Sequence, residues 1–178
     1  ATGRVTITTI PGAPRSLVQF ALSPDGKTMV AGGELSNTLL LFDLTKPPPF
    51  VPVKEIPLAG KPWDPRFSRD GKHVYITLLV KNALAEVDVA TGTVRRIIEG
   101  RMAQPYGLLL RADNKYAFIV NQNTGAIMPG QSGHEMHGME GHAATDGWLT
   151  ILDLAAGTVH STLMLGNGPT GIGAARAR

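Results

Sequence analysis

The chain has 178 residues, of which 43% are hydrophobic, 6% aromatic and 17% charged, with 21 glycines, 13 prolines and no cysteine. Few charges together with many glycines and prolines argue against a helical bundle and favour short strands joined by turns. The apolar content excludes a disordered chain. The net charge is only +3, from 17 Lys and Arg against 14 Asp and Glu. No cluster of basic residues interleaved with aromatic ones is present, so we expect no nucleic-acid partner.

Three absences in the sequence narrow the class of protein further. A chain without cysteine has no disulfide scaffold, thiolate metal site, thiol nucleophile or c-type haem attachment. No run of about 18 apolar residues occurs, so we expect no membrane span. The first ten residues, ATGRVTITTI, lack the basic-then-apolar order of a signal peptide. We therefore expect either a cytosolic chain or an exported one whose leader has been removed.

A repeated unit organises the rest of the sequence. The segments SPDGKTMVAGG (23–33), SRDGKHVYITL (68–78) and RADNKYAFIVN (111–121) share an aspartate turn followed by a strand-like stretch, and their aspartates lie 45 and 43 residues apart. Three further marks recur in fixed order: a hydrophobic strand that ends in Asp, a Gly-x-Val step, and a Pro ahead of the next aspartate turn. They are Asp43, Asp88 and Asp153; Gly3, Gly92 and Gly157; and Pro14, Pro62, Pro105 and Pro169. Such an order indicates a tandem repeat.

Each unit predicts four short strands. In the second unit we expect them at 64–67, 72–79, 83–89 and 93–98. Val, Ile, Thr and Tyr populate these stretches, and Asp-Gly pairs supply the positive φ that tight hairpins need. A four-stranded antiparallel sheet that recurs every 43 to 45 residues has the period of a β-propeller blade. The sequence therefore predicts an all-β fold made of β-propeller blades.

The repeat divides the chain into three full blades and two edge strands. The segments are an outer strand of a preceding blade at 1–13, blades at 14–60, 61–103 and 104–167, the last with a His/Met-rich loop inserted at 122–147, and the first strand of a next blade at 168–178. Propellers close with about four to eight blades, and open strand edges invite pairing. We therefore expect the chain to be part of a larger, seven-bladed ring, with the remaining blades or a partner chain at its open edges. The alternative is a homodimeric ring, in which each junction would lack two inner strands.

The repeat resembles the YVTN-type (YncE-like) β-propeller repeat. The residues that carry the resemblance are Ser23-Pro24-Asp25-Gly26-Lys27, Asn37-Thr38 and Leu40-Leu41-Phe42-Asp43. It covers all of the chain except the inserted segment and the proline-rich stretch 47–52. The Tyr-Val-Thr-Asn core of the family stands here as Val30-Ala31-Gly32-Gly33, Tyr75-Ile76-Thr77-Leu78 and Phe118-Ile119-Val120-Asn121. The resemblance implies a periplasmic or extracellular protein, and it indicates fold more than activity, because similar repeats occur in lactonase-type propellers and in the haem propellers of cytochrome nitrite reductases.

One candidate site lies where the first strands begin. The loops between strands two and three should share a face with the loops that join successive blades, while the aspartate turns fall on the opposite face. Residues after the repeat prolines should then line the mouth of the central channel, where a small molecule or cofactor could bind. The polar and aromatic ones are Arg15, Trp63, Asp64 and Tyr106. The favoured interpretation is that the aromatic pair packs between neighbouring blades, because aromatic side chains mostly contribute buried area.

The second candidate site is the inserted segment 122–147, which contains MPGQSGHEMHGMEGHAATDG. Its candidate metal ligands are His134, Met136, His137, Met139 and His142, and Glu135, Glu140 and Asp146 could add oxygen ligands. Imidazole and thioether together suit copper as Cu(I), and the imidazoles alone suit Cu(II), zinc or nickel. Glycines let neighbouring side chains converge on one ion. The alternatives are a plain solvated loop and a partner-docking loop, and the two methionines among the histidines favour the metal site.

Three functions are compatible with these features. The first is a non-catalytic binding or scaffold propeller, exported, with a metal-binding loop that favours copper. The second is a lactonase- or oxidoreductase-like enzyme that uses the channel mouth. No convergent set of His, Glu and Asp outside the insertion supports the enzyme, so we predict no catalytic residue. The third is a structural subunit that docks partners through its open edges and its inserted loop.

Overall fold

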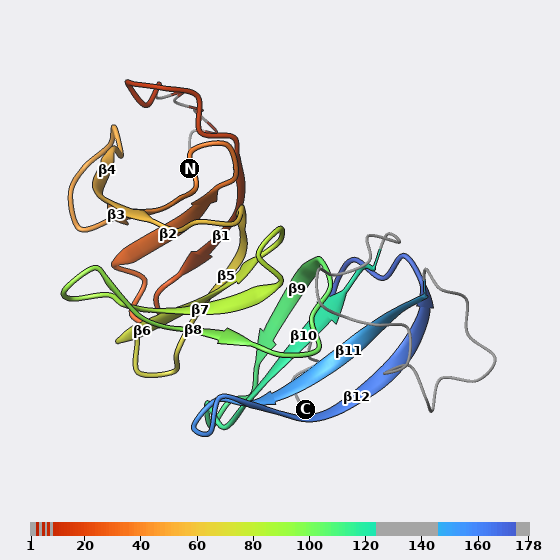
Figure 1. Ribbon diagram of the computed structural model, residues 1–178. Coiled ribbons are helices and arrows are strands. Elements are labelled where there is room, and N and C mark those ends of the chain that lie inside the picture. The colour runs from red at the N-terminus through yellow and green to blue at the C-terminus, as the bar shows by residue number, and fades with distance from the viewer. Residues whose placement is uncertain (1–2, 4, 6, 8, 124–145, 174–178) are drawn as a thin grey trace.

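The computed structural model describes residues 3, 5, 7, 9–123 and 146–173, and all regular structure within them is β. Their twelve strands form three four-stranded antiparallel sheets, each made of four consecutive strands (Figure 1). The strands of the first sheet are β1 (Leu17–Leu22), β2 (Thr28–Gly33), β3 (Thr38–Asp43) and β4 (Pro52–Pro57). Those of the second are β5 (Pro62–Phe67), β6 (His73–Leu78), β7 (Ala83–Asp88) and β8 (Thr93–Glu99). Those of the third are β9 (Pro105–Leu110), β10 (Tyr116–Asn121), β11 (Asp146–Asp153) and β12 (Thr158–Asn167). The prediction of three full four-stranded antiparallel sheets is confirmed.

The turns between the first and second strands of each sheet have the predicted chemistry. Gly26 and Gly71 both have a φ of 71°, and Asn114, with a φ of 57°, takes the same place in the third unit. Glycine adopts positive φ without steric cost, and asparagine tolerates it. In the second sheet β5 begins two residues before the predicted first strand, and the other strand boundaries agree with the prediction within one residue.

The serines and aspartates of these turns bind each other. Ser23 Oγ donates to Asp25 Oδ1, and Ser68 Oγ donates to Asp70 Oδ1, each at 2.6 Å. The Ser23 hydroxyl and the backbone N–H of Lys27 hold the pKa of Asp25 below its ordinary value, and Ser68 lowers the pKa of Asp70 in the same way. Both pairs therefore stabilise turns, which is a common role of serine and aspartate side chains.

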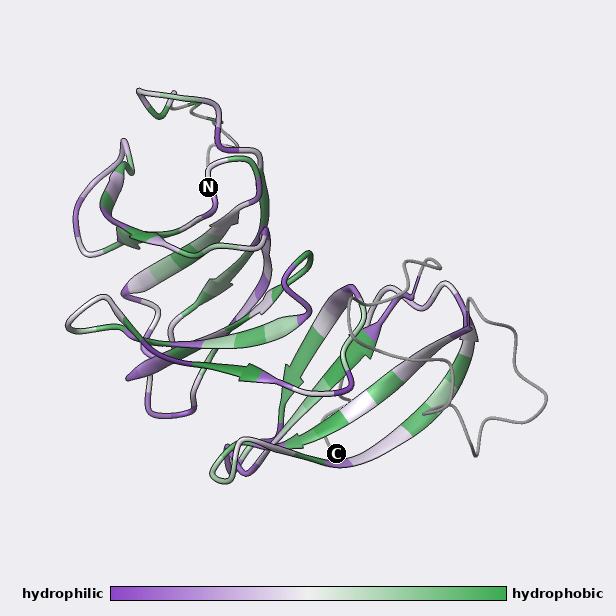
Figure 2. Ribbon diagram, viewed as in Figure 1, coloured by the Kyte–Doolittle hydropathy of each residue, from purple (hydrophilic) through white to green (hydrophobic). Residues whose placement is uncertain are grey.

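Two apolar cores lie between the sheets, and Figure 2 shows hydrophobic segments along strands of all three. The core between the first and second sheets contains Val30, Leu39, Leu41, Ile56, Leu58, Val74, Ile76, Leu78, Ala83, Ala85 and Val87. The core between the second and third contains Tyr75, Leu84, Ile98, Met102, Leu108, Ala117, Ile119, Leu152 and Leu154. Successive side chains of a strand point to opposite faces, so Leu84 and Ala85 of β7 belong to different cores, and both are 0% exposed. The middle sheet is therefore covered on both faces.

A cation on the fourth strand of one sheet reaches a turn of the next sheet. Lys54 of β4 donates to the carbonyl oxygen of Thr91, in the turn between β7 and β8. Arg96 of β8 donates to the carbonyl oxygen of Leu154, in the turn between β11 and β12. Hydrogen bonds from the fourth strands thus add to the apolar contact at both junctions between neighbouring sheets.

The described residues at the two ends of the chain belong to no strand. Val5 and Ile7 are 83% and 90% exposed, while Ile10 packs against the first sheet. Residues 168–173 have no strand assignment either. The expected roles of 1–13 and 168–178 as strands of flanking blades stay predictions. Within the described part of the chain there is no helix long and apolar enough to cross a membrane.

We predict that Leu84→Ala lowers the free energy of unfolding by about 2 to 5 kcal/mol, because truncating a fully buried leucine leaves a cavity between the second and third sheets. Val80→Ala, at a turn position that is 62% exposed, is the control and should change the free energy by less than about 0.5 kcal/mol. Denaturant unfolding followed by circular dichroism measures both variants. A loss for Leu84→Ala no larger than the control would contradict a shared core between these sheets.

Candidate functional site

The three first strands define the inner edge of the assembly, where β1 contacts β5 and β5 contacts β9. A residue with positive φ precedes each of them; these are Ser16 at 49°, Lys61 at 57° and Gln104 at 49°. Counted from these residues, Trp63 and Tyr106 hold the same position in their strands, and the corresponding residue of β1 is Val18. Arg15 lies three residues earlier, outside the strand, so the proline before it does not mark the same structural position as the later ones.

Trp63 and Tyr106 contact each other across the junction between the second and third sheets. Their ring centroids lie 4.6 Å apart with an angle of 43° between the ring planes, and both side chains are half-buried. Tilted aromatic pairs at this separation are favourable packing contacts. The geometry matches the packing role that the sequence analysis favours for the two rings.

Asp64 joins the second sheet to the third. The residue is 5% exposed, and its Oδ2 accepts a hydrogen bond from the backbone N–H of Leu108 in β9 at 2.8 Å. Its Oδ1 lies 2.5 Å from Arg66 Nη1, in an ion contact without hydrogen-bond geometry, and its own N–H donates to Thr77 Oγ1 at 3.1 Å. Burial raises the pKa of Asp64 above its ordinary value, although Arg66 and the Leu108 N–H oppose that rise.

Arg15 contacts a different part of the chain. Its Nη2 lies 2.6 Å from Glu55 Oε1 in β4, and its Nη1 donates to the carbonyl oxygens of Pro11 at 2.9 Å and Ala13 at 3.3 Å. Of the four residues predicted at the channel mouth, the structure therefore brings Trp63, Asp64 and Tyr106 to one junction. The described contacts of Arg15 lie in the first sheet and the segment before it.

The five predicted metal ligands fall outside the described residues; they are His134, Met136, His137, Met139 and His142. Both ends of the inserted segment are described. β10 and β11 pair up to Asn121 opposite Trp148, and beyond this pair Asn123 Nδ2 donates to the carbonyl oxygen of Asp146 at 2.9 Å. The chain thus leaves the third sheet and returns to it at one closed point, which we call the root of the insertion.

A buried hydrogen-bond network lies directly beneath the root. Asn121 is 0% exposed, its Nδ2 donates to Thr150 Oγ1 at 2.9 Å, and its Oδ1 accepts the N–H of Ala103 at 3.0 Å. Thr150 Oγ1 also accepts from Trp148 Nε1 at 3.1 Å and donates to the carbonyl oxygen of Arg101 at 2.6 Å. Side chains from β10 and β11 are therefore tied to the loop before β9, and such satisfied buried networks hold their members in one arrangement.

The third sheet differs from the other two at these three positions. By strand register, Asn121, Trp148 and Thr150 of the third sheet correspond to Leu78, Ala83 and Ala85 in the second sheet. In the first sheet the corresponding residues are Gly33, Thr38 and Leu40. This network was not predicted from the sequence. The available signal in the sequence was Asn121, a polar residue at the end of an otherwise aliphatic strand. Its partners could not be inferred from it, because Trp148 and Thr150 lie 27 and 29 residues further along the chain.

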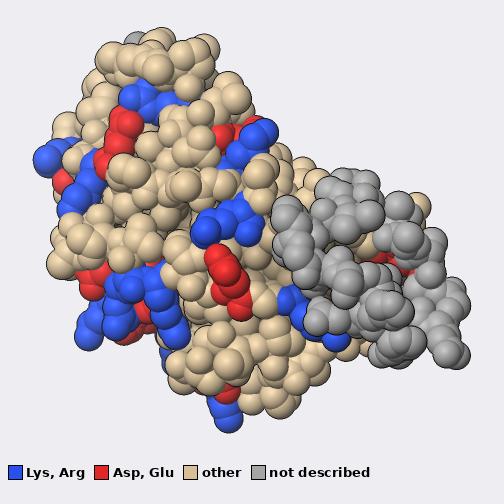
Figure 3. Space-filling model, viewed as in Figure 1, with Lys and Arg blue, Asp and Glu red and all other residues tan. Residues whose placement is uncertain are grey.

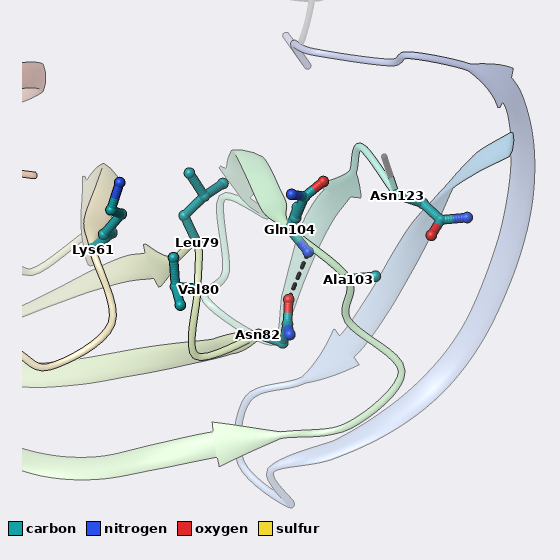
Figure 4. A pocket seen from close by; sticks show the side chains of 7 residues that line it. All are labelled: Lys61, Leu79, Val80, Asn82, Ala103, Gln104 and Asn123. Atoms are coloured by element: carbon teal, nitrogen blue, oxygen red, sulfur yellow. Dashed lines mark hydrogen bonds between the residues drawn. The ribbon is translucent and has the colours of Figure 1, made fainter. Parts of the chain in front are cut away.

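An open pocket of about 280 Å³ lies at the same end of the sheets, between the second and third (Figure 4). It is lined by Lys61, Leu79, Val80, Asn82, Ala103, Gln104 and Asn123. Asn82 Oδ1 accepts the backbone N–H of Gln104 at 2.7 Å and so ties the turn between β6 and β7 to the loop before β9. Because Asn123 belongs to both the pocket wall and the root, the insertion begins beside this pocket.

Charged side chains of both signs are mixed on the face shown in Figure 3. Lys61 Nζ lies 2.9 Å from Glu34 Oε1, and Lys81 Nζ lies 3.4 Å from Glu99 Oε1. Among the described residues, no group of three or more His, Asp or Glu is placed to hold a metal ion. Lys61, which lines the pocket, and Lys81, which lies between the lining residues Val80 and Asn82, are thus both paired to carboxylates.

We predict that Asp64→Asn gains stability relative to the wild type as the pH rises. Because the folded-state pKa of Asp64 is raised, the folded protein binds this proton more tightly than the unfolded chain, whose value is 3.8. The wild type therefore loses stability as the pH rises from that value through the folded pKa, and the amide, which does not titrate, avoids this loss. Denaturant unfolding between about pH 3 and pH 7 measures the difference.

Asp25→Asn provides the control of opposite sign. The folded-state pKa of Asp25 is lowered, so its stabilising contribution is present above 3.8 and is lost as the pH falls through the folded pKa. The stability of the wild type relative to the Asp25→Asn variant should therefore increase as the pH rises through this acidic window. A difference for Asp64→Asn that stays flat or has the sign seen for Asp25→Asn would contradict the buried carboxyl described above.

Comparison with known proteins shows similarity at the level of fold. No protein-family model matches the chain, and no curated protein is similar to it. Among solved structures, the chain is similar to the Kuenenia stuttgartiensis hydrazine synthase, with a TM-score of 0.68 and 19% sequence identity over 84% of this chain. The match covers 37% of that protein's chain, so this chain spans well under half of its length. At this identity the likeness shows the fold alone, an all-β architecture of β-propeller blades.

Proposed function

We propose that this protein is a non-catalytic binding propeller whose third blade presents a transition-metal site. In this proposal the three sheets are the scaffold, and the ligands are His134, Met136, His137, Met139 and His142 of the inserted segment. Mixed imidazole and thioether ligands favour Cu(I), imidazoles alone bind Cu(II), and zinc and nickel are the alternatives. The resemblance of the repeat to an exported family supports a periplasmic or extracellular location.

The observation that carries the proposal is the buried network beneath the root of the insertion. Asn121, Trp148 and Thr150 stand where the second sheet has Leu78 and two alanines. Polar side chains cost more to bury than aliphatic ones unless their hydrogen-bonding partners are present, and here the partners come from three separate stretches of chain. Of the three sheets, the one with this network is the one that carries the His/Met-rich segment.

A closed root favours metal binding in a second way. The 22 residues between Asn123 and Asp146 start and end at two hydrogen-bonded residues. The entropy lost when an ion gathers ligands from a loop grows with the length of chain that must be closed. The protein fold has already brought the two ends of this segment together, so in this proposal copper closes only the shorter loops between its own ligands.

The contacts at the channel mouth support a scaffold role for the other candidates. Trp63 packs against Tyr106, and the carboxylate of Asp64 bonds to the backbone of the next first strand. Each of these interactions connects two blades. We therefore assign these three residues to the cohesion of the propeller and place ligand binding at the insertion.

We predict that the protein binds about one equivalent of copper and that replacing His134, His137 and His142 together with alanine abolishes the binding. Calorimetric titration with elemental analysis of the dialysed protein measures the stoichiometry.

Imidazole binds a metal ion only in its neutral form, so the affinity should fall as the pH drops below about 6.5. In addition, Met136→Leu with Met139→Leu should weaken Cu(I) more than Cu(II), since thioethers prefer the softer ion.

The matched control replaces the remaining two histidines, His73 of β6 and His160 of β12, with alanine. This variant should bind copper as the wild type does. Stoichiometric copper that survives the triple change in the insertion would show that the segment is not the binding site. Equal loss in the control would show that the binding depends on histidine content and not on this segment.

A further inference from the structure

The two junctions between neighbouring sheets have the same backbone arrangement at the end that carries the pocket. Lys61 precedes β5 and Gln104 precedes β9, and both have a positive φ, of 57° and 49°. An asparagine of the preceding sheet holds each of them. Asn37 Oδ1 accepts the N–H of Lys61 at 2.9 Å, and Asn82 Oδ1 accepts the N–H of Gln104 at 2.7 Å. Lys61 and Gln104 therefore stand at equivalent places in the two junctions.

The side chains at these equivalent places differ between the two junctions. Glu34 follows β2 and Leu79 follows β6, so they also correspond. At the junction of the first and second sheets, Lys61 Nζ lies 2.9 Å from Glu34 Oε1, and this ion pair spans the space between the sheets. At the next junction Gln104 and Leu79 take the two places, and they cannot form an ion pair. The pocket of about 280 Å³ lies there, with Leu79 and Gln104 in its wall.

One part of the pocket wall is aliphatic. Its residues are Leu79, Val80 and Ala103 (Figure 4), and Val80 is 62% exposed. An aliphatic group that covers these side chains removes apolar surface from water, which is favourable. The pocket of about 280 Å³ has room for about nine water molecules at about 30 Å³ each. It is therefore large enough for one aliphatic amino-acid residue.

The other part of the wall carries three amide side chains, those of Asn82, Gln104 and Asn123. A side-chain amide has N–H donors and a carbonyl acceptor, which are the groups of a peptide bond. Asn82 uses its Oδ1 for the N–H of Gln104, so the group that it can offer to a ligand is the donor Nδ2. Such a wall matches a ligand that has peptide groups beside an aliphatic side chain.

The charge at the pocket favours an uncharged ligand. Of the seven residues in the wall, only Lys61 is charged, and it is paired with Glu34, whose side chain is 22% exposed. A carboxylate that entered the pocket would lose part of its hydration and would meet a cation that already has a partner. Moving an ion out of water is costly unless an opposite charge compensates for it.

We propose that this pocket binds one uncharged aliphatic residue of a peptide. The aliphatic side chain covers Leu79 and Val80, and the peptide groups bond to the amides of the wall. This inference does not depend on the proposed metal site. It also differs from the site expected at the channel mouth, because Trp63, Asp64 and Tyr106 do not line this pocket.

Two small probes with the same side chain test the ligand class. The probes are N-acetyl-leucine N-methylamide, which is uncharged, and N-acetyl-leucine, which is an anion at pH 7. Both are titrated into the full chain without added metal, and binding is followed by NMR. The amide should bind with a Kd of about 1 to 10 mM, and the anion should bind about fivefold or more weakly. Equal affinity for the two probes, or no saturable binding of the amide, overturns the proposal.

A double variant tests the location of the site. Leu79→Glu with Gln104→Lys places at the second junction the two residue types that span the first one, so the affinity for the amide should fall about tenfold or more. The control adds the same two charges to exposed positions of the fourth strands, as Val53→Glu with Val94→Lys, and should bind as the wild type does.

Val80→Trp fills the pocket from an exposed turn position and serves if the double variant does not fold. It should cause the same loss of affinity. Wild-type affinity in either folded variant overturns the proposal.

Glu34→Gln tests the role of the ion pair. The substitution leaves Lys61 without its carboxylate partner, so the affinity for N-acetyl-leucine should rise about twofold to fivefold. The affinity for the uncharged amide should not change. An unchanged affinity for the anion would show that Glu34 does not set the charge preference, and it would overturn the assignment of an uncharged ligand.

Discussion

The structure depends on one constraint, that its middle sheet is apolar on both faces and must be covered on both. In β7 every residue from Ala83 to Val87 is buried, although successive side chains point in opposite directions. A strand of this kind cannot lie at the surface of a sandwich with one wet face. Sheets with two apolar faces must stack in a row, and their connecting loops are left at the two ends of the row. Ligand-binding residues can therefore lie at the ends of the strands more easily than within the sheets.

The strands were predictable from local turn chemistry. The alignment of the first repeat unit with the other two units was not predictable. Asp-Gly and Asp-Asn pairs fix the turns through the φ that Gly26, Gly71 and Asn114 adopt, and that requirement is visible in the residue types. The start of each first strand depends instead on positive φ at Ser16, Lys61 and Gln104. These three residue types share no preference for that conformation. The repeat prolines were the visible mark, and in the first unit the proline stands three residues too early, which placed Arg15 beside Trp63 in the sequence-based alignment.

The candidate site was predictable where it depends on residue type and not where it depends on long-range pairing. The packing of Trp63 and Tyr106 follows from the size and shape of aromatic rings, so the repeat position was enough to anticipate it. The role of Asn121 depends on Thr150, beyond the inserted segment, and on the backbone of Ala103 in another loop. No local pattern joins these residues, because the strand register that brings them together is set by the fold of the whole sheet.

The buried network also bears on why the third sheet is built differently. Leucine and alanine at the corresponding places pack the second sheet without any hydrogen bond, and replacing a satisfied polar network by aliphatic residues of similar volume is often neutral or stabilising. Cohesion between sheets therefore does not require Asn121 or Thr150. A network of directional bonds does supply something that aliphatic packing lacks, a single arrangement of β10, β11 and the loop before β9. That arrangement sets the distance between the two ends of the inserted segment, so the polar residues are best understood as serving the insertion that they support.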